Sequence, residues 1–302
     1  MAPDPAPGAL HVHLRAHLPA HLPGGLWEDG TEPLRTLALR PVGDEDQSFL
    51  LDTARRLPPA QRANLLLARC LEPEVRHVVP HLTIGDREAL LLQLRGLTLG
   101  DRLECLVSCP RVECGLMMQV HLDVHDVLLP AYADPRAEHV LSLEHGGATI
   151  VLRLRLPCAA DLDRVGNLAS PDAEAAATTL LAACVLDVRV DGTLAQLDLL
   201  DEVVVAEVER KLAELDPQAE IELELECSEC GLPFEVLFDA GTFLLQEVDE
   251  QADQLLADVH LLALHYHWGE REILSMSSDR RSRYLDLVTA TLATHSSPWD
   301  LP

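Results

Sequence analysis

The chain has 302 residues, of which 48% are hydrophobic, enough apolar material for one large folded domain or two smaller ones. Its formal net charge is -27, Lys211 is the only lysine, and only 3% of the residues are aromatic. Nucleic-acid binding needs a positive surface and aromatic stacking platforms, so this composition argues against a nucleic-acid partner.

The sequence also argues against membrane insertion and export. The N-terminus lacks the basic stretch followed by an apolar stretch that a secretory signal requires. No uncharged apolar run approaches the roughly 18–20 residues of a membrane-spanning helix. We therefore expect folding and assembly in the cytoplasm, where the eight cysteines are more readily free thiols or metal ligands than disulfides.

The first predicted elements are an arm and a pair of helices. Residues 1–32 mix Pro, Gly, Ala and His without a sustained period, which predicts a flexible N-terminal arm. Residues 44–70 have a helical pattern interrupted by Pro58 and Pro59, which predicts two short packed helices. These helices open a first unit that we assign to residues 33–130.

An internal repeat is the most informative feature of the chain. Residues 86–124 are predicted to form a helix, a strand, a turn with two cysteines and a returning strand. Residues 201–239 repeat that order, and we assign the second unit to residues 201–240. The sequence thus predicts two pseudo-repeated units, each a helix followed by a β-hairpin with a zinc-knuckle turn.

Apolar and polar residues alternate along both predicted hairpins, so each hairpin has one buried and one solvated face. The apolar rows are Leu103, Cys105, Val107, Leu116, Met118, Val120 and Leu122 in the first hairpin, and Ile221, Leu223, Leu225, Leu232, Phe234, Val236 and Phe238 in the second. The glutamates from Glu220 to Glu226 fall on the solvated face, where they are either simply hydrated or face a basic partner.

The remaining segments complete an α+β fold. A connecting segment, residues 131–200, contains a hairpin turning at Gly146 and Gly147 and a helix starting near Ser170 and Pro171. Residues 241–292 are predicted to form C-terminal helices, the longest over residues 243–267. Residues 293–302 form a tail without predicted structure.

The four cysteines of the two turns have the spacing of zinc ligands. Cys227 and Cys230 are separated by two residues, Cys109 and Cys114 by four, and a glycine follows the second cysteine of each pair. Zinc favours tetrahedral thiolate sites, and glycine permits the positive φ that closes such a turn. We therefore predict one structural Zn²⁺ held by these four residues, with a full coordination sphere and no open position for a substrate.

Other readings of the cysteines remain open. Cys105 could replace Cys109 as a ligand, although it lies on the apolar row of its strand. A redox pair at Cys227 and Cys230 is less favoured, because redox motifs of this spacing normally open a helix and here strands flank the turn. The other cysteines, Cys70, Cys158 and Cys184, are expected to be buried thiols.

No catalytic signature is present in the sequence. We find no Walker loop, no zinc-protease helix motif, no nucleophile elbow and no dinucleotide-binding glycine pattern. His260, His265 and His267 are close together on the predicted long helix, but they are better explained as ordinary helix residues than as metal ligands. We expect neither an enzyme nor a small-molecule substrate.

Two blocks of the chain resemble a known family. They are residues 82–124, with their Gly-Asp-Arg, strand and knuckle order, and residues 227–288, which end in Tyr-Leu-Asp-Leu-Val. Both resemble the zinc-knuckle baseplate proteins of T-even-type contractile phage tails and related phage-tail-like contractile injection systems. The resemblance extends over roughly residues 34–290.

The resemblance implies a non-catalytic component of a baseplate that contacts other baseplate or hub proteins. It implies assembly in the cytoplasm followed by residence in the baseplate of the particle. The alternative is a cytoplasmic assembly chaperone or adaptor that is not retained in the particle. A zinc-ribbon regulator that binds nucleic acid is disfavoured by the charge and the low aromatic content.

Overall fold

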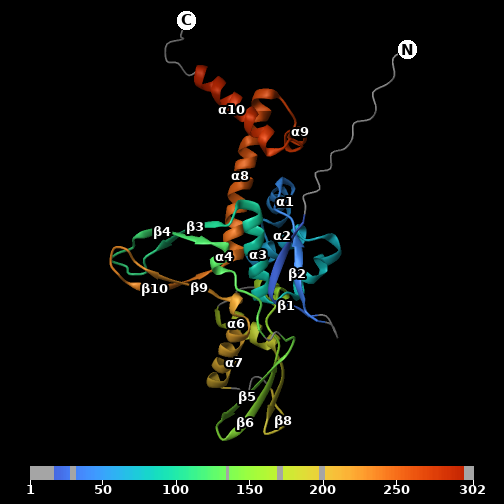
Figure 1. Ribbon diagram of the computed structural model, residues 1–302, viewed down its shortest axis with the longest axis vertical. Coiled ribbons are helices and arrows are strands. Elements are labelled where there is room, and N and C mark those ends of the chain that lie inside the picture. Colours follow the sequence, from blue (N-terminus) through green and yellow to red (C-terminus); the bar gives the residue numbers. More distant parts are fainter. Residues whose placement is uncertain (1–16, 28–31, 134–135, 169–172, 197–200, 296–302) are drawn as a thin grey trace, which may run out of the picture.

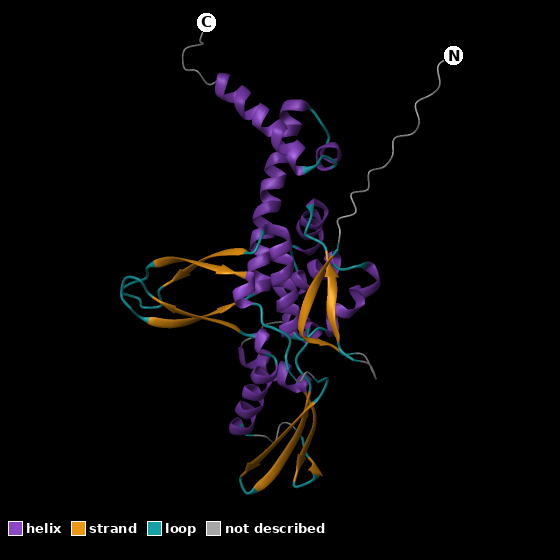
Figure 2. Cartoon of the chain, in the orientation of Figure 1, coloured by secondary structure: helices purple, strands orange, loops and turns teal. Residues whose placement is uncertain are grey.

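The computed structural model of the chain describes residues 17–27, 32–133, 136–168, 173–196 and 201–295, which form helices and four small antiparallel sheets (Figure 1 and Figure 2). This arrangement confirms the expected α+β class. The strands are β1 (Leu18–Leu26), β2 (Leu34–Leu39), β3 (Arg102–Ser108), β4 (Met117–Asp123), β5 (His139–His145), β6 (Ala148–Leu154), β7 (Val185–Val190), β8 (Thr193–Leu194), β9 (Ile221–Glu226) and β10 (Pro233–Phe238).

The helices follow the predicted order, with additions. They are α1 (Asp44–Phe49), α2 (Pro59–Cys70), α3 (Ile84–Leu99), α4 (Val124–Val127), α5 (Ala159–Gly166), α6 (Ala173–Cys184), α7 (Glu202–Leu215), α8 (Ala240–Tyr266), α9 (Glu270–Leu274) and α10 (Ser278–His295). Three further turns are the π-helical η1 (Leu50–Ala54) and the 3-10 helical η2 (Pro73–His81) and η4 (Pro217–Ala219).

Helix α3 lies at the centre of the main core. It begins after Thr83, whose hydroxyl accepts a hydrogen bond from the amide of Asp86, and it ends at Gly100, which has a φ of 90°. Its leucines occupy adjacent faces and are almost completely buried, so the helix is enclosed on several sides rather than on one stripe. They are Leu90, Leu91, Leu92 and Leu94.

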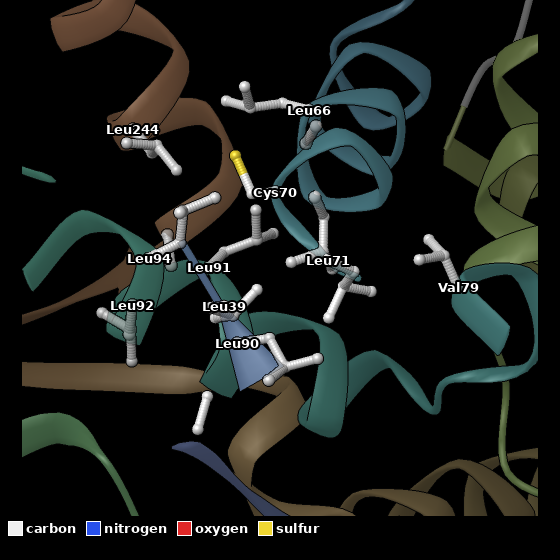
Figure 3. Close-up of a cluster of buried hydrophobic side chains, with 14 of the residues drawn as sticks. Leu39, Leu66, Cys70, Leu71, Val79, Leu90, Leu91, Leu92, Leu94 and Leu244 are labelled. Carbon is white, nitrogen blue, oxygen red and sulfur yellow. The ribbon is translucent and has the colours of Figure 1, made fainter. Parts of the chain in front are cut away.

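Side chains from β2, α2 and α8 surround these leucines in one continuous core. Figure 3 shows Leu39, Leu66, Cys70 and Leu244 around the α3 leucines. All four are buried. The core therefore joins segments that are far apart in the sequence, from the N-terminal hairpin to the first half of α8.

The prediction of a flexible arm over residues 1–32 is wrong for residues 18–26. These residues form β1, which pairs with β2 and contributes the buried side chains of Ala20, Leu22 and Leu26 to the core. The prolines are tolerated because the strand belongs to a two-stranded sheet with a register shift between His21 and Leu26. Residues 1–16 lie outside the described residues.

The connecting segment contains a separate small sheet with its own core. The hairpin predicted at Gly146 and Gly147 is present as β5 and β6, and β7 and β8 extend it to the order β5-β6-β7-β8. Leu152 of this sheet and Val208 of α7 belong to one buried cluster. Strands β7 and β8 and helix α5 were not predicted. The predicted helix start at Ser170 falls outside the described residues, and α6 begins at Ala173.

Helix α8 connects the main core to a C-terminal lobe (Figure 1). Its first half contributes Leu244 and Val248 to the main core, and its second half packs against α9 and α10 through Leu262. In that lobe Tyr266 stacks on Trp268 with ring centroids 4.5 Å apart. The predicted tail from residue 293 is helical as far as His295, and the rest of it is not described.

Charged side chains attach α8 to the central helix. Arg95 donates two hydrogen bonds to the Glu247 carboxylate, over 2.9 and 2.7 Å, and also donates to the carbonyls of Gly100 and Arg102 at the start of β3. Glu88, buried in α3, accepts hydrogen bonds from the first amides of α8, including that of Ala240 over 3.0 Å. Such paired, buried charges fix the relative positions of the two helices.

In the described part of the chain, no helix is long and apolar enough to cross a membrane.

Candidate metal centre

Two β-hairpins project from the main core and form an arm of the molecule (Figure 1 and Figure 2). The first consists of β3 and β4, paired from Arg102 opposite Asp123 to Ser108 opposite Met117. The second consists of β9 and β10, paired from Ile221 opposite Phe238 to Glu226 opposite Pro233. We call this pair of hairpins, residues 102–123 and 221–238, the arm.

In each hairpin of the arm, the predicted apolar row is buried near the main core but only partly buried farther out. Leu103 and Ile221, close to the bases of the hairpins, are buried members of the main core. Farther along, Val120 and Phe234 are only half-buried. Because an isolated two-stranded hairpin is marginally stable at best, the outer part of the arm needs a further source of stability.

The turns at the ends of the two hairpins differ in length but share two local features, a closing hydrogen bond and a glycine with positive φ. In the first, the amide of Cys109 donates to the carbonyl of Leu116 over 2.9 Å; in the second, the amide of Cys227 donates to that of Leu232 over 2.9 Å. The glycine after each second cysteine has a positive φ, 54° at Gly115 and 64° at Gly231. Glycine adopts this conformation without steric cost, which explains its place in both turns.

These turns bring the four predicted sulfur ligands together. The Sγ atoms of Cys109, Cys114, Cys227 and Cys230 all lie within 4.8 Å of one another. Cys109 Sγ is 3.7 Å from Cys230 Sγ, and Cys114 Sγ is 3.7 Å from Cys227 Sγ. A disulfide needs about 2.05 Å. Two sulfurs on a tetrahedral zinc ion with Zn–S bonds of about 2.3 Å lie about 3.8 Å apart, so the cluster is compatible with a metal site.

The electrostatic environment differs among the four thiols. The amides of Cys230 and Glu229 donate hydrogen bonds toward the Cys227 sulfur and lower the pKa of its thiol to about 6. Loss of hydration raises the pKa of the Cys109 thiol to about 12. Turn amides pointing at sulfur stabilise thiolates, which are the form that binds a metal.

The other cysteines lie outside this cluster. Cys105 is buried on the inner face of β3, opposite Val120, and burial raises the pKa of its thiol. Cys70 and Cys184 are buried, and Cys158 is half-buried. Among the described residues, no second group of three or more histidine, cysteine or acidic side chains is close enough to hold a metal, and this includes the histidines of α8.

A buried polar network, which was not predicted from the sequence, fixes the base of the second hairpin. Asp216, just before η4, accepts hydrogen bonds from the amide of Gly85 over 2.8 Å and from the hydroxyl of Tyr132 over 2.9 Å. Gln218 is fully buried, and its side chain accepts from the amide of Leu129 over 2.6 Å. The network thus connects η4, which leads into β9, with α3 and with the loop after α4.

Asp86, next to Gly85, is a second buried carboxylate in this region. One of its oxygens accepts a hydrogen bond from the amide of Gly24 over 2.8 Å, whereas Oδ2 is buried without a hydrogen-bond partner among the described residues. Burial raises the pKa of Asp86 to about 6, and the nearby Asp216 carboxylate acts in the same direction. Its protonation is therefore coupled to the stability of this junction.

Comparison with known proteins gives one family. The model of the T4 bacteriophage base plate protein family matches residues 41–245. This range includes both hairpins of the arm and all four clustered cysteines, and it ends within α8. Comparisons with curated proteins and with solved structures give no match. Since the match covers more than half of the chain, this protein belongs to the T4 bacteriophage base plate protein family.

Proposed function

We propose that the chain is a non-catalytic structural component of the baseplate of a contractile phage tail or phage-tail-like injection system, in which one structural Zn²⁺ connects the ends of the two hairpins. Family membership supports the baseplate role. The observation that carries the zinc site is the convergence of four sulfurs from turns that are more than a hundred residues apart in sequence.

The ligand set favours structural zinc. Cys109, Cys114, Cys227 and Cys230 supply four thiolates, which complete a tetrahedral sphere and leave no position for water or a substrate. The site lies at the ends of the hairpins, far along the arm from the main core (Figure 1). A metal there crosslinks two segments that are each weakly stable alone.

The expected stabilisation is large relative to the arm. In the unfolded chain, a bridge between Cys114 and Cys227 closes a loop of 113 residues, for which the length-dependent entropy is about 4 kcal/mol. The bridge contributes most where apolar packing is incomplete, at the outer half of the arm. Metal binding is thus the term that keeps the two hairpins face to face.

We further propose that the two hairpins derive from one duplicated helix-and-hairpin unit, within residues 33–130 and 201–240. The order α3, β3, β4 parallels the order α7, β9, β10, and the two turns share one hydrogen bond and one positive-φ glycine. The helices differ in setting, because α3 is enclosed in the main core whereas α7 packs on the separate sheet.

Zinc content tests the metal part of the proposal. Elemental analysis of the purified chain is expected to give about one zinc per chain, and Cys114→Ser is expected to abolish it. Cys105→Ser is the matched control, because Cys105 lies on the adjoining strand but outside the cluster, and it should retain the metal. A chain purified without metal and fully stable in that form would refute the zinc site.

Particle composition tests the baseplate part. Mass spectrometry of purified contractile particles from the source is expected to detect this chain together with other baseplate proteins. Its presence in the lysate during assembly and absence from the particles would instead favour the assembly chaperone or adaptor.

A further inference from the structure

The edge of β9 is exposed along a cavity. β9 is hydrogen-bonded to β10 on one side, and in the described part of the chain no strand pairs with its other edge. A cavity of about 450 Å³ follows that edge from Glu220 to Leu225. Its other walls come from Leu122, from α4 and the loop after it, and from η4, and none of the described residues that line it belongs to β10.

The register shows which backbone groups face this edge. The amide of Cys227 donates to the carbonyl of Leu232, so Cys227 points its backbone groups toward β10. In an antiparallel pair the direction alternates, so Leu225 and Leu223 also point toward β10. The backbone groups of Glu222, Glu224 and Glu226 therefore point to the open edge.

The two faces of β9 differ sharply in chemistry. The side chains of Glu222, Glu224 and Glu226 are exposed on the outer face, and Glu224 lies directly opposite Glu235 of β10. Like charges in directly opposed positions destabilise a hairpin. The inner face beside the cavity carries Ile221, Leu223 and Leu225.

The corresponding face of the first hairpin carries a cation beside its carboxylates. Arg102 lies opposite Asp123, and its guanidinium lies 3.4 Å from the carboxylate of Glu104. The second hairpin, residues 221–238, contains no lysine, arginine or histidine, so its glutamates have no cation within the hairpin. It is also the hairpin whose open edge borders the cavity.

We propose that the open edge of β9 binds an extended segment of a partner protein, in which apolar residues alternate with basic ones, as a third strand. Residues of that segment opposite the glutamates lie on the outer face and neutralise their charge. The residues between them lie on the inner face, in the cavity beside Leu122, Val127 and Leu129. This mode of recognition takes its affinity from main-chain hydrogen bonds and its specificity from alternate side chains.

This inference rests on the proposed function, because the zinc site holds the second hairpin in position, and zinc content is therefore measured with every binding experiment. The probe is a synthetic peptide of alternating valine and lysine, as long as β9, added to the full zinc-loaded chain. It is expected to bind at least about tenfold more tightly than a peptide of the same composition with the valines and lysines in separate blocks.

Proline substitutions on the two edges test where the strand is added. Proline removes one backbone amide and is tolerated on an edge that does not use it. Glu224→Pro removes an amide at the cavity edge, and it should weaken peptide binding by about tenfold or more. Glu235→Pro, on the opposite edge of β10, changes the same charge pair but should leave the affinity within about twofold.

Hydrogen exchange supplies an independent readout. Peptide binding is expected to slow exchange at the amides of Glu222 and Glu224, with little change at the already bonded amide of Cys227. If Glu224→Pro loses zinc, the wild-type chain is tested instead with two versions of the peptide, each N-methylated on one of the two alternating sets of residues. Only one set of peptide amides can point toward β9, so methylation of that set should abolish binding and methylation of the other set should not.

Equal affinity for both peptides, equal effects of the two proline variants, or unaffected binding of both N-methylated peptides would overturn strand addition. A zinc-loaded chain that fails to bind the alternating peptide overturns this inference alone. A chain that holds no zinc overturns the metal site instead.

Discussion

The main core and the arm are stabilised in different ways. In the core, Leu91 and Leu66 are fully buried and charged pairs such as Arg95 and Glu247 attach the surrounding helices. In the outer arm, Val120 and Phe234 keep part of their surface in water, and the four cysteines occupy the far end. Apolar burial therefore dominates in the core, and we propose that a metal crosslink replaces it where two hairpins are too thin to form a core.

The difference has a functional consequence. A projecting arm offers a partner exposed strand edges and charged faces that a compact domain would cover. In our proposal, the zinc site allows this exposure without loss of a defined structure. The following changes, in decreasing order of expected effect, test this division between the two regions.

Removal of the metal is expected to separate the two regions most clearly. In the double variant Cys227→Ser and Cys230→Ser, amide protection of β9 and β10 should fall by about a thousandfold or more, because the binding free energy of a structural zinc ion, about 10–16 kcal/mol in small zinc domains, stabilises only the folded arm. Protection of α3 should remain. Hydrogen exchange monitored by mass spectrometry measures both, with Cys105→Ser as the control that keeps zinc. Loss of protection throughout the molecule would show that the regions are not independent.

A cavity in the main core should have a large effect that does not depend on zinc. Leu91→Ala is expected to lower the free energy of unfolding by about 3–4 kcal/mol, because it removes a fully buried side chain. Leu106→Ala on the outer face of the arm, where the side chain is 72% exposed, should change it by less than about 0.5 kcal/mol. Denaturant unfolding measures both changes. Similar losses of free energy of unfolding in the two variants would contradict the difference between core and arm.

The junction between the regions should depend on pH through Asp86. Its pKa is raised from its ordinary value of 3.8 to about 6 in the folded state, so the folded chain binds this proton more tightly than the unfolded chain. The contribution of Asp86 to stability therefore falls as the pH rises from about 4 to about 6, by about 3 kcal/mol at most.

Asp86→Asn removes this titration, so its stability relative to the wild type should increase over the same pH range and level off above it. Chemical unfolding at a series of pH values gives the difference. A difference that is constant with pH would show that the carboxyl group is not buried in the way described.

A smaller effect is expected where the network meets the second hairpin. A Cβ at position 85 would lie 2.0 Å from Asp216 Oδ1, so Gly85→Ala must displace a carboxylate that holds the segment before β9. We expect a loss of about 2 kcal/mol, partly offset by the helix propensity of alanine. Gly269→Ala, where the nearest atom is 3.8 Å from the added Cβ, is the control for thermal unfolding. Equal melting temperatures of the two variants would argue against a structural role for the network.

The local elements could be predicted because their signals are local. The strict alternation of apolar and polar residues predicted both hairpins of the arm, and each pair of cysteines followed by a glycine predicted a turn. The long C-terminal helix followed from its apolar period.

The parts that were missed depend on contacts between distant residues. β1 contains Pro19, Pro23 and two glycines, which are typical of loops, yet pairing with β2 and burial of Leu22 make it a strand. The Asp86 and Asp216 network leaves no periodic pattern, because it joins α3 to a segment 131 residues away. A glycine beside an aspartate in the first turn of α3 is the one local sign of it.

X-ray absorption at the zinc edge of this chain is the direct test of whether four thiolates from the two hairpins bind one zinc ion. We expect four sulfur neighbours at about 2.3 Å and no nitrogen or oxygen neighbour in the first coordination sphere. Fewer sulfur neighbours, with oxygen or nitrogen completing the sphere, would refute the four-thiolate site.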